Sequence, residues 1–226
     1  MELVIAQVEV LRARLTQAFE GWADQSSAHA CALSGGSTAL VFLDALRNAQ
    51  ADWSRISLFW VDERAVPPEN PDSNYGMAHR VLLGPLGHTA PRAFRMPAEQ
   101  ADLGEAVVHY DQILVRELRG GPLDLAILGV GEDGHICSLF PGHRALMAEG
   151  RVVAVDDAPK PPPRRLSLTL SYVKQTRQIW VVVIGPQKRD VLQTAIQRTQ
   201  LSTPLDLLLS QAKDVTIFTD QSVRRT

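Results

Sequence analysis

Short apolar runs alternate along the chain with longer stretches in which apolar residues recur every three or four positions. The short runs predict β-strands and the longer periodic stretches predict amphipathic helices. The expected strands cover residues 28–33, 56–61, 92–96, 125–130, 152–155, 165–170, 178–184 and 215–219. The expected helices cover residues 2–20, 39–49, 75–83, 99–118 and 187–197.

The run at 125–130 is apolar throughout and the run at 178–184 is apolar after Gln178, and neither has polar residues at alternate positions. This pattern is typical of strands that a parallel sheet buries on both faces. Helices between such strands favour right-handed βαβ connections, so we predict a doubly wound, largely parallel α/β sheet with helices on both faces. The proline-rich segments 65–73 and 156–165 are expected to form a surface loop and a stiff extended connection. We expect one domain over residues 1–226.

Composition narrows the class of protein. The net charge is only -2, with 23 basic and 25 acidic residues spread along the chain, so no nucleic-acid partner is indicated. No apolar run approaches the roughly 20 residues of a membrane span. The first predicted helix is charged, which argues against a secretory leader and favours a cytoplasmic protein without a membrane partner. Cys31 and Cys137 lack metal-site spacing, and we expect buried free thiols. A monomer and a small homo-oligomer both fit the sequence.

A glycine-rich loop follows the strand predicted at 28–33 and consists of Ser34, Gly35, Gly36, Ser37 and Thr38. Its glycines allow successive backbone amides to converge ahead of a helix, an arrangement that suits an anion such as phosphate. Ser37 or Thr38 is expected to cap that helix. No Gly-Lys-Ser/Thr follows, so the loop is not a Walker A motif. An ordinary capped turn is the alternative interpretation.

A second glycine-rich loop, at residues 129–135, carries Asp133 and His135. A histidine whose tautomer is fixed by a nearby carboxylate is a natural base at neutral pH. Alternatively, His135 only ties the loop together, or it binds a metal with His143 as a further ligand. The glycine spacing also matches a dinucleotide fingerprint, but Pro141 follows too soon for the helix that this fingerprint requires.

Candidate nucleophiles are scarce, because the chain has no G-x-S-x-G elbow and neither cysteine lies in polar company. Water activated by a base remains as the attacking group. Three basic residues lie at strand ends or helix starts, where they could face a charged substrate: Arg64, Arg165 and Lys188. Each is equally compatible with a solvated surface charge.

The combination of motifs resembles the 6-phosphogluconolactonase family. The matching segments are SGGST at 34–38, VDER at 61–64, NPDSNYGMAHRVLL at 70–83, GVGEDGHICSLFPG at 129–142 and RLSLTL at 165–170. The resemblance implies a Rossmann-like fold and hydrolysis of 6-phospho-D-glucono-1,5-lactone, a small phosphosugar lactone of the pentose phosphate pathway, without cofactor or metal. It also implies that the 34–38 loop holds the phosphate, with Arg64, Arg165 and Lys188 as further anion contacts. We add Asp62, Asn74 and Gly131 to the substrate-binding set.

The related glucosamine-6-phosphate deaminase/isomerase family is the main alternative. It resembles this chain around Asp133 and His135, but carries Tyr after its Asp-Glu pair and a catalytic Glu before the Pro that ends the central loop. Arg64 and Phe140 stand at those positions here. Ring-opening isomerisation needs that acid, whereas lactone hydrolysis does not, so the departures favour the lactonase. A non-catalytic sugar-phosphate sensor is a further alternative.

For the lactonase we expect His135, oriented by Asp133, to remove a proton from the water that attacks C1 of the lactone. Arg64 or loop amides would stabilise the resulting oxyanion. This mechanism requires the 34–38 loop and His135 to share one cleft, although they lie about a hundred positions apart in the sequence.

Overall fold

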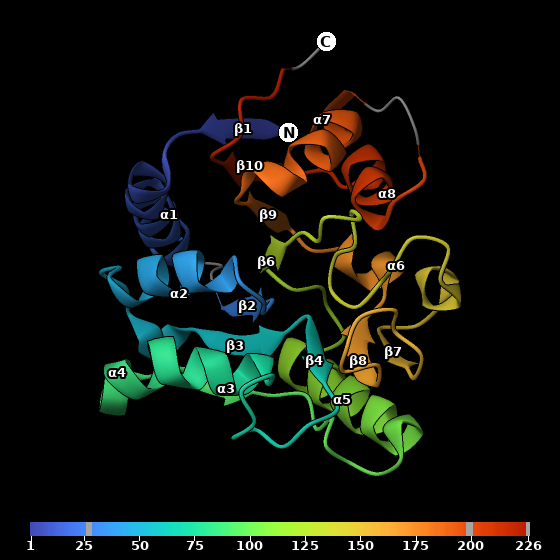
Figure 1. The fold of residues 1–226 in the computed structure, drawn as a ribbon. Coiled ribbons are helices and arrows are strands. Elements are labelled where there is room, and N and C mark those ends of the chain that lie inside the picture. The colour runs from blue at the N-terminus through green and yellow to red at the C-terminus, as the bar shows by residue number, and fades with distance from the viewer. Residues whose placement is uncertain (26–28, 198–200, 225–226) are drawn as a thin grey trace.

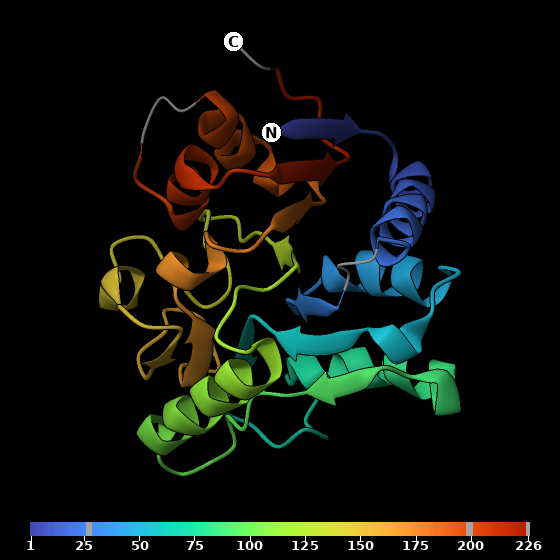
Figure 2. The same ribbon diagram turned by 180° about the vertical axis from the view of Figure 1, so that it is seen from behind.

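The computed structural model describes residues 1–25, 29–197 and 201–224. Its centre is a parallel sheet of seven strands in the order β1-β10-β9-β6-β2-β3-β5 (Figures 1 and 2). The strands are β1 (Glu2–Ile5), β2 (Ala30–Leu33), β3 (Ser57–Trp60), β5 (Arg92–Phe94), β6 (Leu125–Gly129), β9 (Gln178–Val183) and β10 (Val215–Thr219). The parallel order confirms the predicted fold class.

The sheet is wound in two directions from its middle. From β2 the chain proceeds through β3 to β5 at one edge, and from β6 it proceeds through β9 and β10 towards the other. The direction therefore reverses between β2 and β6, which pair in parallel. In open α/β sheets, ligands bind outside the carboxyl ends of the strands at such a reversal.

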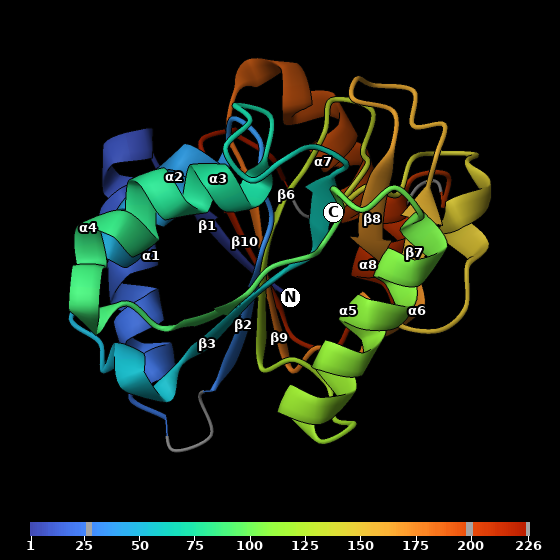
Figure 3. The same ribbon diagram turned by 90° about the horizontal axis from the view of Figure 1, so that it is seen from below.

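Helices cover both faces of this sheet. Viewed from below, α1, α2 and the α3–α4 stretch lie on one side, and α5, α6 and α8 lie on the other (Figure 3). The α-helices are α1 (Val8–Ala23), α2 (Ala39–Arg47), α3 (Asn74–Ala78), α4 (Gly84–Leu86), α5 (Leu103–Leu118), α6 (Leu170–Val173), α7 (Arg189–Gln197) and α8 (Pro204–Gln211). Shorter helical turns are η1 (Trp53–Arg55), η2 (His79–Leu83, a π-helix), η3 (Gly87–Thr89), η4 (Arg144–Met147) and η5 (Pro186–Lys188).

The layers meet in a continuous apolar core. Every residue of β2 is buried, and so are the first four residues of β6, which explains why these strands lack polar positions. Leu11, Leu15 and Phe19 of α1 are fully buried against this core, as their helical spacing predicts. Cys31 and Cys137 are buried free thiols, so this prediction is confirmed.

A second, three-stranded antiparallel sheet has the order β4-β8-β7, with β4 (Asp62–Arg64), β8 (Arg165–Leu168) and β7 (Val152–Val155). The strands β7 and β8 were expected, but their separation from the main sheet was not. The charged sequence of β4 gave no strand signal. Its backbone pairs with β8 in a register that sets Arg64 opposite Arg165, and this pairing brings two predicted anion contacts together.

Two other expectations differ from the structure. The predicted helix at 2–20 begins only at Val8, because residues 2–5 form β1 and pair with β10 at the edge of the sheet. Helix α8 was not predicted; Thr203 and Asp206 form a capping box at its start, with Pro204 in the first turn. Part of the strand expected at 28–33 lies outside the described residues, and β2 begins at Ala30.

Candidate active site

The carboxyl ends of four adjacent strands, β9, β6, β2 and β3, open into one cavity of about 320 Å³. Because the strands are parallel and neighbouring, the segments that follow them meet at the same edge of the sheet. The residues lining the cavity include Ser34, Gly35, Gly36, Ser37, Thr38, Asp62, Arg64, Asn74, Gly131, His135, Arg165 and Lys188. Every predicted site residue thus lines this cavity except Asp133, which is bonded to His135.

The 34–38 loop presents free backbone amides to the cavity. Ser34 fixes the loop to β6, because its amide donates to the Ile127 carbonyl at 3.0 Å and its hydroxyl accepts from the Gly129 amide at 2.7 Å. Gly36 has φ +83°, a conformation that favours glycine. Within the described part of the chain, the amides of residues 35–38 have no hydrogen-bond acceptor. Four successive unpaired N–H groups in a loop that lines the cavity and precedes a helix suit an anion.

The expected helix cap at this loop is absent. Thr38 precedes α2 with helical backbone angles, and its side chain makes no capping hydrogen bond. Its hydroxyl instead accepts from Nζ of Lys188 at 2.8 Å. Lys188 is only 6% exposed, and burial lowers its pKa, although Glu132 partly opposes that effect. The bond joins η5, directly before α7, to the 34–38 loop and holds a cation beside the free amides.

Asn74 packs directly over the same loop. A side-chain carbon on Gly35 would overlap the Asn74 side-chain amide, so only glycine fits there. Asn74 is 2% exposed and donates from Nδ2 to the Asp62 backbone carbonyl at 2.9 Å. Glu63, which was not among the predicted site residues, holds the start of α3 by accepting hydrogen bonds from the amides of Asn74 and Tyr75. Sequence reasoning missed Glu63 because its partners lie eleven and twelve positions away.

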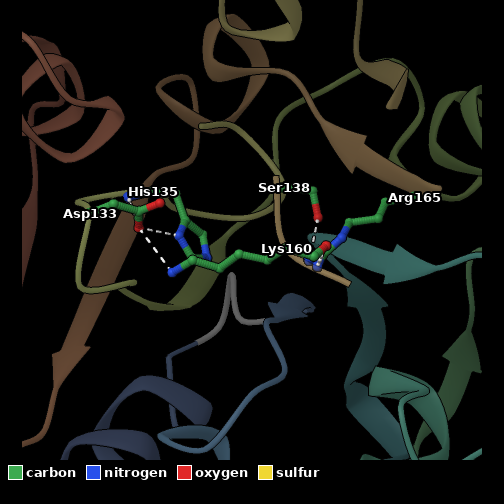
Figure 4. A network of polar contacts seen from close by, with 5 residues as sticks. All are labelled: Asp133, His135, Ser138, Lys160 and Arg165. Carbon is green, nitrogen blue, oxygen red and sulfur yellow. Dashed lines mark hydrogen bonds and ion pairs between the residues drawn. The ribbon is translucent and has the colours of Figure 1, made fainter. Parts of the chain in front are cut away.

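The Asp133 and His135 side chains point at each other across the tight turn after β6 (Figure 4). Asp133 Oδ1 lies 2.5 Å from His135 Nδ1, so Nδ1 carries the donated proton and Nε2 is left as the acceptor. Burial lowers the pKa of His135, against the opposing influence of the bonded carboxylate. Burial alone would raise the pKa of Asp133, but the hydrogen bond from His135 lowers it overall. At neutral pH the pair therefore consists of a neutral imidazole and a carboxylate.

Gly131 makes this pair possible. A side-chain carbon at position 131 would overlap the imidazole ring of His135 and also meet Asp133 Oδ1 at 2.6 Å. The backbone closes the turn through the Gly131 amide, which donates to the His135 carbonyl at 2.9 Å. The structure therefore gives Gly131 a role in seating the ring, in addition to its place on the cavity wall.

Comparisons with known proteins fit this geometry. Residues 5–217 match the family model described as glucosamine-6-phosphate isomerases/6-phosphogluconolactonase. The chain belongs to this family. It is 39% identical over 175 residues to the 6-phosphogluconolactonase of Mycobacterium tuberculosis, covering 73% of this chain and 71% of the relative. It is 34% identical over 218 residues to a probable chloroplastic 6-phosphogluconolactonase of Oryza sativa, covering 87% of this chain and 65% of the relative.

Solved structures show the same fold. A 6-phosphogluconolactonase from Thermotoga maritima superposes with a TM-score of 0.82 at 23% identity, covering 96% of this chain and 99% of that one. A monomeric glucosamine-6-phosphate deaminase superposes almost as well, with a TM-score of 0.81 at 18% identity and 98% of each chain covered. Both branches of the family therefore share this architecture, and the fold alone does not separate their chemistry.

Two residues at which the sequence departs from the deaminase branch lie at the site. Arg64 lines the cavity and is fixed by a hydrogen bond from Nη1 to the Asp72 carbonyl at 2.8 Å. The Phe140 ring lies 4.5 Å from the ring of His135, centre to centre, and shields one side of it. The side chain at position 140 thus contributes no acid and helps to keep His135 partly buried.

Arg165 lies at the cavity, but most of its donors are occupied. It is 3% exposed; Nε donates to the Pro162 carbonyl at 2.9 Å and Nη2 to the Lys160 carbonyl at 2.8 Å. Asp62 is also buried and accepts from Oγ of Ser138 at 2.7 Å. Direct contact of Arg165 or Asp62 with a substrate remains a prediction. Ser138 and Lys160 were not predicted as site residues. Their partners, Asp62 and Asp133, lie far away in the sequence, and no sequence motif connects them.

The alternative interpretations of the central loop find less support. His143 bonds to Asp157 at 2.9 Å through Nε2 instead of joining His135, and no group of metal-ligating side chains occurs among the described residues. No helix starts at Gly134; β6 leads instead into a turn and an isolated bridge between Ile136 and Leu139. A dinucleotide fingerprint would need a helix there.

None of the helices in the described ranges has the length and apolar character that a membrane span requires.

Proposed function

We propose that this protein hydrolyses 6-phospho-D-glucono-1,5-lactone to 6-phosphogluconate. One observation carries the proposal: the 34–38 loop with its four unpaired amides, Lys188 and His135 line the same cavity, and Asp133 is bonded to His135 behind that wall. The amides and the cation match a phosphate monoester, and the pair matches a base that activates water. The curated relatives carry the name of this activity.

The proposed reaction begins with the phosphate in the 34–38 loop, which positions the lactone ring. Nε2 of His135 takes a proton from water as the water oxygen attacks C1. Arg64 or free loop amides stabilise the negative charge that develops on the carbonyl oxygen. The C1–ring oxygen bond then breaks, and the imidazolium returns its proton to the departing ring oxygen. Asp133 stabilises the imidazolium between these two transfers.

The test is a pH-stat assay on freshly made lactone, corrected for spontaneous hydrolysis, with glucosamine 6-phosphate assayed in parallel for ammonia release. We expect lactone hydrolysis well above the spontaneous rate and no ammonia release. Ammonia release without lactonase turnover would assign the chain to the deaminase chemistry of its family. Absence of both activities, with 6-phosphogluconate still bound, would favour a sugar-phosphate sensor.

A further inference from the structure

Lys160 reaches the His135–Asp133 pair from a distant part of the chain, the proline-rich connection between β7 and β8 (Figure 4). Its Nζ lies 3.5 Å from Asp133 Oδ1, the same oxygen that accepts the hydrogen bond from His135. Lys160 also lines the cavity. We propose that Lys160 is a positioning residue of the site, whose charge keeps Asp133 ionised and His135 neutral so that His135 can accept a proton from water.

Hydrogen bonds from the Arg165 side chain fix the backbone around Lys160. The buried guanidinium donates from Nη2 to the carbonyls of Lys160 and Pro161, at 2.8 and 3.3 Å, and from Nε to the carbonyl of Pro162. Three consecutive carbonyls are thus held by one rigid planar group. The guanidinium lies over the Phe140 ring, 5.6 Å from its centre. The Phe140 ring in turn packs on His135. The position of Lys160 is therefore set by buried contacts, although its own side chain is 44% exposed.

The charges around His135 oppose one another. Asp133 and Asp62 favour the imidazolium, whereas burial and the charge of Lys160 favour the neutral ring. The other charged groups that line the cavity are Arg64, Arg165, Lys188 and Glu132. Two carboxylates without a nearby cation would favour the protonated form of His135, which cannot act as a base. The positive charge of Lys160 lies next to the Asp133 oxygen that contacts the ring, and it weakens the effect of the Asp133 charge on His135. Asp133 can therefore orient the ring while the ring stays neutral.

The direct test follows the titration of the His135 imidazole by NMR in the full chain, with the signal assigned by its loss in His135→Gln. Removing the cation in Lys160→Met should raise the pKa of His135, because the imidazolium no longer faces a like charge. Lys160→Arg should restore the wild-type titration. Lys174→Met, which removes one charge at the residue after α6, where Lys174 bonds to Gln211, should leave it unchanged. An unchanged His135 titration in Lys160→Met, or an equal shift in Lys174→Met, would overturn the inference.

The kinetic counterpart rests on the proposed function. In Lys160→Met the acid limb of the kcat/KM profile should move to higher pH, so that kcat/KM on that limb falls about fivefold, the size expected for one partly screened charge, with a smaller fall at neutral pH. Lys160→Arg should recover both. A wild-type protein without lactonase activity would remove the proposed function, yet the NMR titration would still decide the role of Lys160. Normal lactonase activity with an unmoved acid limb would reject that role alone.

Discussion

The 34–38 loop and the 131–135 turn follow the neighbouring strands β2 and β6, between which the winding of the sheet reverses. One of them contributes mainly backbone groups to the site, and the other contributes mainly side chains. The 34–38 loop offers backbone amides, and its side chains mostly serve to shape it. The 131–135 turn offers two side chains, and its backbone serves to bring them together. We therefore expect changes in the shape of the 34–38 loop to affect substrate binding, and removal of the His135 imidazole to affect turnover.

The largest effect should come from the 131–135 turn. Replacing His135 by Gln removes the base, and we expect kcat to fall by about 100- to 10,000-fold, the usual contribution of a positioned base. KM should change little, because the amides and Lys188 remain in place. Initial rates on fresh lactone measure both constants. His143→Gln is the matched control, since His143 bonds Asp157 and does not line the cavity. If both variants lose kcat equally, His135 has no special role.

The next effect should come from the shape of the 34–38 loop. In Gly35→Ala the new methyl group would overlap the Asn74 side chain, which has little room to retreat because it is buried. We expect KM to rise about tenfold or more, since small displacements of a positioning group are costly. Gly21→Ala is the control, because nothing lies within 4 Å of a side-chain carbon there. Unchanged KM in Gly35→Ala would argue against a phosphate at this loop.

A smaller effect is expected from the cation beside the loop. Lys188→Met keeps the buried volume similar but removes the charge that faces the anion. A charge-assisted hydrogen bond contributes about 1.5 kcal/mol at the lower end of its range, and we expect this lower value because the four loop amides remain, so KM should rise about tenfold while kcat stays near the wild-type value. Lys213→Met removes an exposed charge and serves as the control. A loss confined to kcat would instead place Lys188 at the reacting atoms.

The smallest effect concerns pH. Burial lowers the pKa of His135 from its ordinary value of 6.5, so the neutral, active ring persists to a lower pH than in an isolated histidine. Activity is lost as pH falls through this lowered pKa and His135 becomes protonated. The acid limb of kcat/KM should therefore have its midpoint below 6.5. A midpoint above that value would show that the Asp133 carboxylate outweighs burial and Lys160.

Sequence predicted one of these two regions better than the other. The amide loop needs only local features, two glycines between a strand and a helix, and these are visible in the sequence. The Asp133–His135 contact is also local. The support around it is not: Lys160 and Phe140 reach the pair only after folding, and Arg165 turned out to bond three backbone carbonyls. Long-range contacts of this kind leave no periodic signal in one sequence.

The fold shows the same limit. Buried parallel strands such as β6 were predictable, because their apolar runs are continuous. The strand β1 was hidden in a helical periodicity, since Val4, Val8 and Leu11 have helical spacing whatever the backbone does at residues 2–5. The strand β4 was hidden because Asp62 and Arg64 are charged, and only pairing with β8 makes them a strand. In both cases tertiary pairing outweighed local preference.

The division of work between the two regions is tested most directly by calorimetric titration of 6-phosphogluconate into His135→Gln. The account predicts a Kd within about threefold of the wild-type value in a variant whose turnover has fallen at least 100-fold, because the phosphate is held by groups that the substitution does not touch. A loss of product binding that matches the loss of turnover would contradict it.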